Sequence, residues 1–236
     1  MMTKSISLLT LFAVLAAPAL ALGVRPDADI ARDAARKPAE MVAFAHVVPG
    51  AKVVDIMAGG GYFTRVFSNA VGSGGHVTAI VPPSSAERDP VSAKSITDLA
   101  SDASYGNISV LPGLNDPSLS GNIDVAWTSQ NYHDLHNFLP PEGVMGFNKA
   151  VFAILKPGGI YVVLDHAAVA GSGTAATNTL HRIDPAVVKA EVVAAGFVFD
   201  GESKVLANPA DARTALVFDP SIRGKTDQFV YRFRKP

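Results

Sequence analysis

From residue 51 onward, short runs of β-branched and apolar residues alternate with longer stretches whose apolar positions recur every three to four residues. Runs of the first kind predict strands, and stretches of the second kind predict amphipathic helices. We predict strands at residues 51–57, 76–81, 107–111, 123–129 and 160–165, and helices at residues 62–71, 91–100, 142–155 and 185–195. Strict alternation of strand and helix indicates a parallel sheet with helices on both faces.

The two ends of the chain depart from this alternation. Residues 214–218 and 228–233 are interpreted as two strands with no helix between them, which predicts an antiparallel hairpin. Residues 27–46 have helical spacing that Pro38 should kink or break, so we interpret residues 22–48 as an N-terminal helical cap. The predicted fold class is α/β: a seven-stranded, mostly parallel sheet with helices on both faces and a C-terminal antiparallel hairpin, formed by one domain over residues 22–236.

The first 21 residues have the pattern of a secretory signal peptide. Lys4 is the only charged residue before Arg25, an apolar run covers residues 6–17, and Ala19-Leu20-Ala21 matches an Ala-x-Ala cleavage site. An uncleaved anchor helix is the alternative, but Pro18 interrupts a run that is shorter than the roughly 20 residues a span needs. We therefore expect cleavage after Ala21 and a periplasmic or secreted protein, with no membrane association afterwards.

Composition narrows the range of partners and chemistry. The 236 residues include 20 basic and 21 acidic side chains, a balance that does not favour nucleic-acid binding or a polybasic membrane surface. The chain has no cysteine, which excludes disulfides, thiolate metal sites and cysteine nucleophiles. We expect a small-molecule partner, and the sequence does not indicate the oligomeric state.

A glycine-rich turn follows the first predicted strand. Asp55 stands at the strand end, and Ala58, Gly59, Gly60 and Gly61 lead into the helix predicted from residue 62. Glycines let the backbone approach a ligand closely, and the exposed N–H groups of a helix start favour a polar or anionic group. A tight turn without a ligand is the alternative, because such a turn is weak evidence by itself.

Several segments together resemble class I S-adenosylmethionine-dependent methyltransferases over residues 38–236. They are the lead-in at residues 49–55, the glycine turn, the Leu-Lys-Pro-Gly-Gly turn and strand at residues 155–165, Tyr-His-Asp-Leu-His-Asn at residues 132–137 and Leu-His-Arg-Ile-Asp at residues 180–184. The last two are similar to segments of a group of small, predicted exported methyltransferases. The resemblance implies a Rossmann-like methyltransferase fold.

The resemblance also implies a cofactor site for S-adenosylmethionine. Its amino-acid end would be held by the glycine turn, at Asp55, Ala58, Gly59, Gly60 and Gly61. Two positions differ from the family pattern: Met57 stands in place of the first glycine, and Val81 stands where an acid usually binds the ribose hydroxyls. Glu87 and Asp89 are the nearby acids that could take over the second task.

Four of the six histidines fall near the predicted carboxyl ends of strands. His133 and His136 follow the fourth predicted strand, His166 ends the fifth beside Asp165, and His181 lies in the connection after it. The ligand crevice of an open parallel sheet lies at this edge. We assign general acid or base roles, acting on the acceptor, to His133, His136, Asp165, His166 and His181.

Two alternatives for these histidines remain: structural roles, and a divalent metal that would orient and deprotonate a diol. We assign no metal ligand from the sequence. Arg36 and Asp33 of the N-terminal segment are interpreted as part of a solvated helix face, and the alternative is that they reach over the site from the N-terminal cap. The function predicted is exported, S-adenosylmethionine-dependent methylation of a small molecule. The alternative is a periplasmic binding or metal-handling protein that kept the fold and lost the cofactor.

Overall fold

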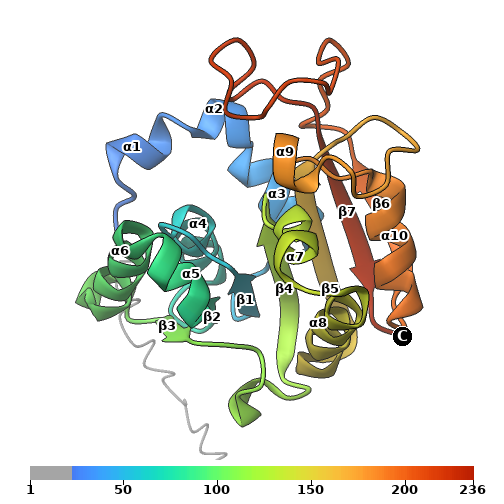
Figure 1. Cartoon of the computed structure of the whole chain (residues 1–236). Coiled ribbons are helices and arrows are strands. Elements are labelled where there is room, and N and C mark those ends of the chain that lie inside the picture. Colours follow the sequence, from blue (N-terminus) through green and yellow to red (C-terminus); the bar gives the residue numbers. More distant parts are fainter. Residues whose placement is uncertain (1–22) are drawn as a thin grey trace, which may run out of the picture.

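The computed structural model describes residues 23–236, so the predicted signal peptide lies outside the described residues. A seven-stranded sheet has the order β3-β2-β1-β4-β5-β7-β6 (Figure 1). Strands β1 to β5 are mutually parallel where they pair, and β7 runs antiparallel to both β5 and β6. The predicted fold class is confirmed. The strands are β1 (Lys52–Ile56), β2 (His76–Ile80), β3 (Ile108–Leu111), β4 (Ile123–Ser129), β5 (Leu155–His166), β6 (Val198–Ser203) and β7 (Gln228–Arg234).

Helices cover both faces of the sheet because successive strand residues point to opposite sides. Val53 packs in a core with α3 (Pro38–Phe44), α4 (Tyr62–Val71) and α6 (Pro90–Ser101). Its neighbour Val54 packs in the opposite core with α7 (Tyr132–Phe138), α8 (Pro141–Ile154) and α10 (Pro185–Ala194). The remaining helices are α1 (Asp27–Ile30), α2 (Asp33–Arg36), α5 (Pro83–Arg88), α9 (Thr177–Leu180) and the 3-10 turns η1 (Ala103–Tyr105) and η2 (Pro117–Leu119).

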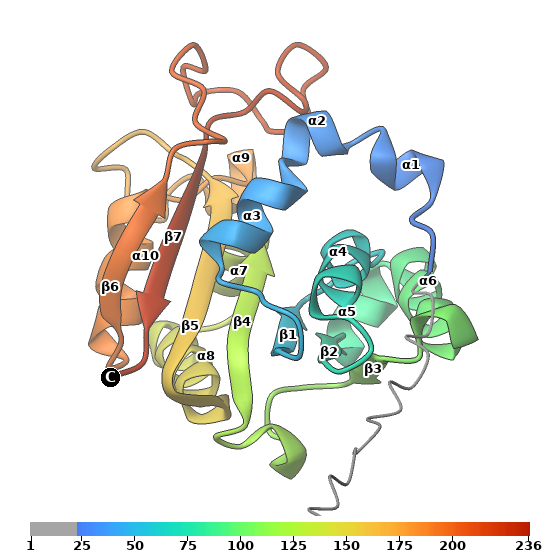
Figure 2. The same ribbon diagram turned by 180° about the vertical axis from the view of Figure 1, so that it is seen from behind.

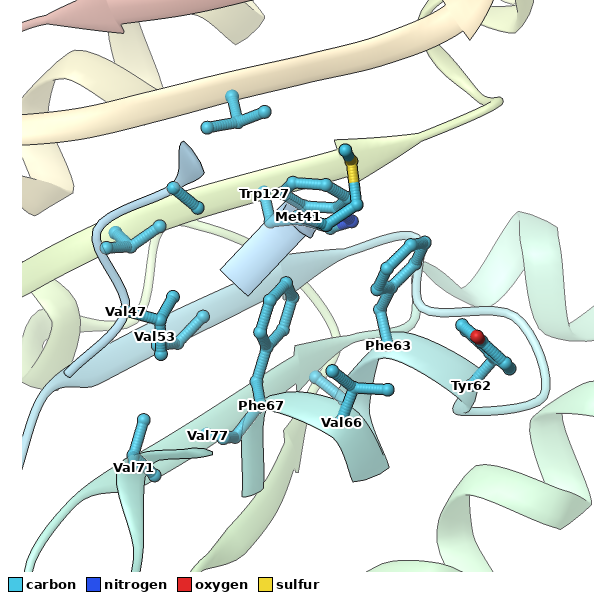
Figure 3. Packing of buried hydrophobic residues seen from close by; sticks show 14 of the residues in the cluster. Met41, Val47, Val53, Tyr62, Phe63, Val66, Phe67, Val71, Val77 and Trp127 are labelled. Atoms are coloured by element: carbon cyan, nitrogen blue, oxygen red, sulfur yellow. The ribbon is translucent and has the colours of Figure 1, made fainter. Parts of the chain in front are cut away.

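Aromatic side chains fill the first core (Figure 3). The rings of Phe63 and Phe67 on α4 lie 4.7 and 5.2 Å from that of Trp127 on β4. Met41 of α3 is also fully buried there, which attaches the N-terminal helices to the sheet. Among the described residues, no helix has the combination of length and apolarity that crossing a membrane would require.

The N-terminal segment forms three short helices that pass across the upper end of the molecule, above α4 (Figure 2). The predicted break at Pro38 is confirmed, since α3 begins there and Lys37 before it has a left-handed φ of 50°. A second break, between α1 and α2, was not predicted. This arrangement brings α2 to the edge where the parallel strands end.

The predicted strand at residues 214–218 is wrong. That segment is irregular and is attached to a buried side chain: the carbonyl of Ala215 accepts a hydrogen bond from Arg182 Nε at 2.9 Å. The strand that pairs with β7 is β6 instead. Its sequence contains Asp200-Gly201, which favours a turn, but Gly201 lies at a bulge with a φ of 141° and the pairing continues past it. The C-terminal antiparallel pair therefore has a long connection, residues 204–227, at the carboxyl edge of the parallel strands.

Candidate active site

The strand order reverses between β1 and β4, and this switch point positions the site. The connection after β1 leads to β2 and the connection after β4 leads to β5, on opposite sides of the switch point. A crevice therefore remains between the carboxyl ends of the two strands. The side chain of Asn131, just after β4, donates a hydrogen bond to the carbonyl of Met57, just after β1, at 2.9 Å. This bond fixes the two strand ends relative to each other at the floor of the crevice.

A pocket of about 680 Å³ opens at this point. Its wall comes from the ends of β1, β2 and β3, the start of α6, and helices α7 and α8. Ala58 and Gly59 of the predicted cofactor loop line it. Gly59 has a left-handed φ of 54° and open space where a Cβ would be, so the backbone is accessible to a ligand there. A pocket of this volume is the size that a drug-sized ligand fills.

The other loop residues have different surroundings. Gly60 lies outside the pocket wall and its carbonyl accepts hydrogen bonds from Arg65 and Ser95. Gly61 has a φ of 84°, and a Cβ on it would lie 2.9 Å from Ile96 Cδ1. Glycine at this position is therefore needed where the start of α4 packs against α6.

Asp55 is buried beneath the loop and accepts a hydrogen bond from Thr64 Oγ1 at 2.6 Å. Burial raises the pKa of Asp55 to about 7, although the bond from Thr64 and the charge of Arg36 act in the opposite direction. Its carboxyl group joins the end of β1 to α4. A direct contact of Asp55 with a cofactor stays a prediction.

Both departures from the family pattern lie in the pocket wall. Met57 has a φ of 54°, so the backbone takes the left-handed conformation that glycine adopts readily, despite the side chain. Val81 follows β2, and Asp89 lies in the same wall whereas Glu87 lies outside it. Asp89 is thus the acid that can face a ligand near the end of β2.

Beside the pocket, three side chains form a continuous chain of hydrogen bonds. Asp165, which is fully buried, accepts from the backbone N–H of His133 at 2.8 Å and from its Nδ1 at 2.9 Å. Nε2 of His133 lies 3.1 Å from Nδ1 of His181. α9, which His181 follows directly, lies beside α7 (Figure 1). Three of the predicted catalytic residues are therefore in direct contact.

The charges of Asp165 and His133 in this hydrogen-bonded chain stabilise each other. Burial disfavours a charged His133, but the negative charges of Asp165 and Asp134 outweigh it, and the pKa of His133 lies above its ordinary value. Burial alone would raise the pKa of Asp165, yet the charge and hydrogen bond of His133 hold it below the ordinary value. Asp165 thus favours the His133 tautomer that carries its proton on Nδ1 and directs Nε2 toward His181.

Asp134 connects these hydrogen-bonded side chains to the pocket. Its Oδ1 lies 3.6 Å from Nε2 of His133, and its side chain contributes to the pocket wall. The side chain of Asn137 donates to the same oxygen at 3.2 Å. Asp134 is not among the residues to which the sequence assigned a role.

His136 and His166 are not part of this row of hydrogen-bonded side chains. Nε2 of His136 lies 3.2 Å from Glu191 on α10, a carboxylate that also accepts from the Tyr132 hydroxyl. Nδ1 of His166 lies 2.8 Å from the hydroxyl of Thr226, and burial lowers the pKa of His166 to about 4, so it is neutral at pH 7. The roles assigned to both stay predictions, and their contacts tie α7 to α10 and β5 to the loop before β7.

Arg36 follows the alternative interpretation and reaches toward the site. It does not belong to a solvated face: its Nη2 donates to Gln130 Oε1 at 2.9 Å, and its guanidinium lies over the ring of Tyr62 with 4.7 Å to the centroid. Burial lowers the pKa of Arg36 to about 10, so it stays charged at neutral pH. α2 therefore places a cation beside the end of β4.

Comparison with solved structures agrees with this architecture. An S-adenosylmethionine-dependent methyltransferase from Aquifex aeolicus is similar with a TM-score of 0.61 and 15% identity, covering 87% of this chain and 98% of that one. The 1,6-didemethyltoxoflavin-N1-methyltransferase of Burkholderia thailandensis, solved with 1,6-didemethyltoxoflavin and S-adenosylhomocysteine, has a TM-score of 0.58 and 18% identity, covering 89% and 81%. The protein has the class I methyltransferase fold.

A possible exported protein from Bordetella parapertussis shares this methyltransferase fold, with a TM-score of 0.54 and 15% identity over 87% of this chain and 68% of that one. No protein-family model matches the sequence, and no curated protein matches it. At these identities the likeness establishes the methyltransferase fold alone. The chemistry therefore depends on the pocket and on the side chains around it.

Proposed function

We propose that the protein is an S-adenosylmethionine-dependent methyltransferase that acts on a small-molecule acceptor outside the cytoplasm. The observation that carries this proposal is the adjacency of two features. A pocket lined by the glycine loop lies at the switch point of a methyltransferase fold, and Asp134 in its wall lies 3.6 Å from the imidazole of His133. A donor site and a proton-accepting group are thus next to each other.

The pocket residues fit the cofactor in their chemistry. Ala58 and Gly59 offer backbone close to the amino-acid end, and Asp89 offers a carboxylate to hydroxyl groups. Val81 and Leu114 add apolar surface of the kind that an aromatic base packs against. Met57 takes a left-handed φ of 54°, so its side chain has not prevented the loop from adopting a glycine-like conformation.

When bound, S-adenosylmethionine supplies an electrophilic methyl group for in-line transfer to a nucleophilic atom. The protein has to position the acceptor and remove its proton. Asp165 orients His133 and stabilises its positive charge, so Nε2 can receive a proton directly or through His181. His181 is partly exposed, whereas His133 is buried, so His181 is the member of the pair that solvent and an acceptor can reach.

Export is the second part of the proposal, and it is supported by the signal-like pattern of residues 1–21. The fold similarity to a possible exported protein is consistent with it. Acceptors would then be molecules that occur in the periplasm or medium, and the cofactor would have to reach that compartment.

Methyl transfer can be tested with S-adenosylmethionine that carries a deuterated methyl group. The purified protein is incubated with this donor and a small-molecule extract of the native host, and mass spectrometry searches for deuterium-labelled products. We expect labelled small molecules, and a loss of roughly 10²–10⁴-fold in labelling with His133→Ala, because a positioned base contributes that much. His46→Asn is the control, since His46 is exposed and pairs with Arg232. The absence of both labelling and donor binding would instead support the binding-protein alternative.

A further inference from the structure

Three potential metal-ligand side chains converge beside the pocket. His133, Asp134 and His181 each offer one ligand atom, and these atoms all lie within 4.8 Å of one another. Nε2 of His133 is 3.1 Å from Nδ1 of His181 and 3.6 Å from Oδ1 of Asp134. His133 and Asp134 come from the first turn of α7, and His181 follows α9, so two separate elements create the cluster.

These separations suit a single small cation. Zinc binds imidazole nitrogen and carboxylate oxygen at about 2.0–2.2 Å, which places neighbouring ligand atoms of a tetrahedral site about 3.4 Å apart. The two measured separations lie on either side of that value. The third separation, between Asp134 and His181, is within 4.8 Å, and an ion bound to both imidazoles would replace the hydrogen bond between them.

The cluster also has the outer contacts that metal ligands need. Nδ1 of His133 donates to buried Asp165, so Nε2 carries no proton, which is the state that a metal ligand requires. The side chain of Asn137 donates to Oδ1 of Asp134 and holds that carboxylate. A carboxylate behind a ligating imidazole fixes its tautomer and raises its basicity.

The backbone at His181 has an uncommon conformation. His181 has a left-handed φ of 53° at the end of α9, a conformation that few non-glycine residues adopt. Its ring lies between those of His133 and Phe218, with centroid distances of 5.2 and 5.0 Å. Residues held in such conformations concentrate at functional sites.

We propose that His133, Asp134 and His181 bind one divalent first-row transition-metal ion of the zinc type. Two imidazoles and one carboxylate suit such an ion better than Mg²⁺ or Ca²⁺, which prefer oxygen ligands. Three protein ligands leave a coordination position open, and Asp134 places the ion at the pocket wall. An acceptor hydroxyl at that position would be oriented and made more acidic, so the ion would take the place of His133 Nε2 in activating the acceptor. Ion binding itself does not depend on methyl transfer.

The test is direct metal binding to the purified protein after removal of metals with a chelator. Zn²⁺ is titrated calorimetrically, and Co²⁺ is followed by its visible absorption, which reports its ligand geometry. We expect one ion per chain. His181→Asn should weaken binding by more than about 100-fold, and Asp165→Asn by about 10–100-fold, the usual effect of losing an outer carboxylate.

His46→Asn is a matched control, because His46 is also a histidine with a left-handed φ, 55°, but its Nε2 lies 2.9 Å from Arg232 of β7 and not in the cluster. Asparagine tolerates this conformation, so both asparagine variants should fold, which circular dichroism verifies. Unchanged Zn²⁺ affinity in folded His181→Asn, or no stoichiometric ion in the parent protein, would overturn the proposal. Methylation activity has no part in either readout.

Discussion

Replacing Asp165 with asparagine removes the charge that organises His133 while nearly conserving the side-chain shape. The carboxylate accepts from the backbone N–H groups of His133 and His166 at 2.8 and 2.7 Å, and from Nδ1 of His133 at 2.9 Å. Asparagine has one acceptor oxygen, so one backbone N–H would face an amide NH₂ group and lose its acceptor. Because a hydrogen bond to a charged group contributes about 1.5–3 kcal/mol, we expect the free energy of unfolding to fall by about 3 kcal/mol.

The same substitution should reverse the tautomer of His133. The amide NH₂ favours Nδ1 as an acceptor, which moves the imidazole proton to Nε2 and removes the lone pair that faces His181. A comparable Asp-to-Asn change behind a catalytic histidine lowers turnover by about 10⁴-fold through the wrong tautomer. We therefore expect methylation by Asp165→Asn to fall by at least about 10²-fold.

The stability loss should depend on pH. The pKa of His133 is raised in the folded protein, so its contribution to stability is present below its ordinary value of about 6.5 and is lost as the pH rises through the folded value. In Asp165→Asn, His133 stays buried but loses the charge of Asp165, so we expect the pKa of His133 to fall below its ordinary value. Protonation of His133 at low pH would then destabilise the folded protein. The stability gap between parent and variant should widen as the pH falls from about 8 to about 5.

Urea denaturation of chelator-treated proteins at several pH values measures this gap, and ¹⁵N NMR of the imidazoles reports the tautomer. Asp124→Asn is the control, because Asp124 is a half-buried carboxylate that accepts from the Lys52 backbone and from Lys156. It should cost no more than about 1 kcal/mol. A loss in Asp165→Asn no larger than in this control, or a His133 that keeps its proton on Nδ1, would refute the reasoning.

Three further outcomes are expected. Val81→Asp restores an acid at the end of β2 and should tighten S-adenosylhomocysteine binding about tenfold, the value of one charged hydrogen bond; unchanged affinity in calorimetry would mean that no ribose hydroxyl lies there. His136→Ala removes the contact with Glu191 and should cost about 1 kcal/mol in denaturation experiments, and turnover within about twofold of the parent would favour a structural role for His136. A large loss of turnover would instead place His136 in the chemistry. Mass spectrometry of the protein from its native host should find Leu22 at the N-terminus, and an intact Met1 in the cytoplasmic fraction would contradict export.

Much of the fold followed from local pattern, because each parallel strand and each amphipathic helix buries its own periodic face. The C-terminal edge of the sheet could not be predicted from local pattern. Asp200-Gly201 favours a turn by composition, but pairing with β7 converts that turn into a bulge, and only the partner strand determines this. Residues 214–218 alternate like a strand, yet buried Arg182 binds their backbone instead.

The site was predictable where it depends on strand ends and unpredictable where it depends on helix orientation. His133, Asp165 and His181 share one sheet edge, which the order of elements already indicates. No helix was predicted at residues 132–138, so His136 was grouped with His133, although in α7 one imidazole meets Asp165 and the other meets Glu191. The contact of Arg36 with Gln130 spans 94 residues, and no local signal specifies it.

Calorimetric titration of the purified protein with S-adenosylhomocysteine tests the central claim, that the glycine-loop pocket is the cofactor site, most directly. We predict one site per chain. Gly59→Ala should weaken it at least about tenfold by placing a methyl group at the pocket wall. Gly50→Ala is the matched control, since both glycines have positive φ and open space at Cβ, and only Gly59 lines the pocket. Binding that is lost in Gly59→Ala and kept in Gly50→Ala is the predicted result, and no binding by the parent, or equal affinity in both variants, would contradict it.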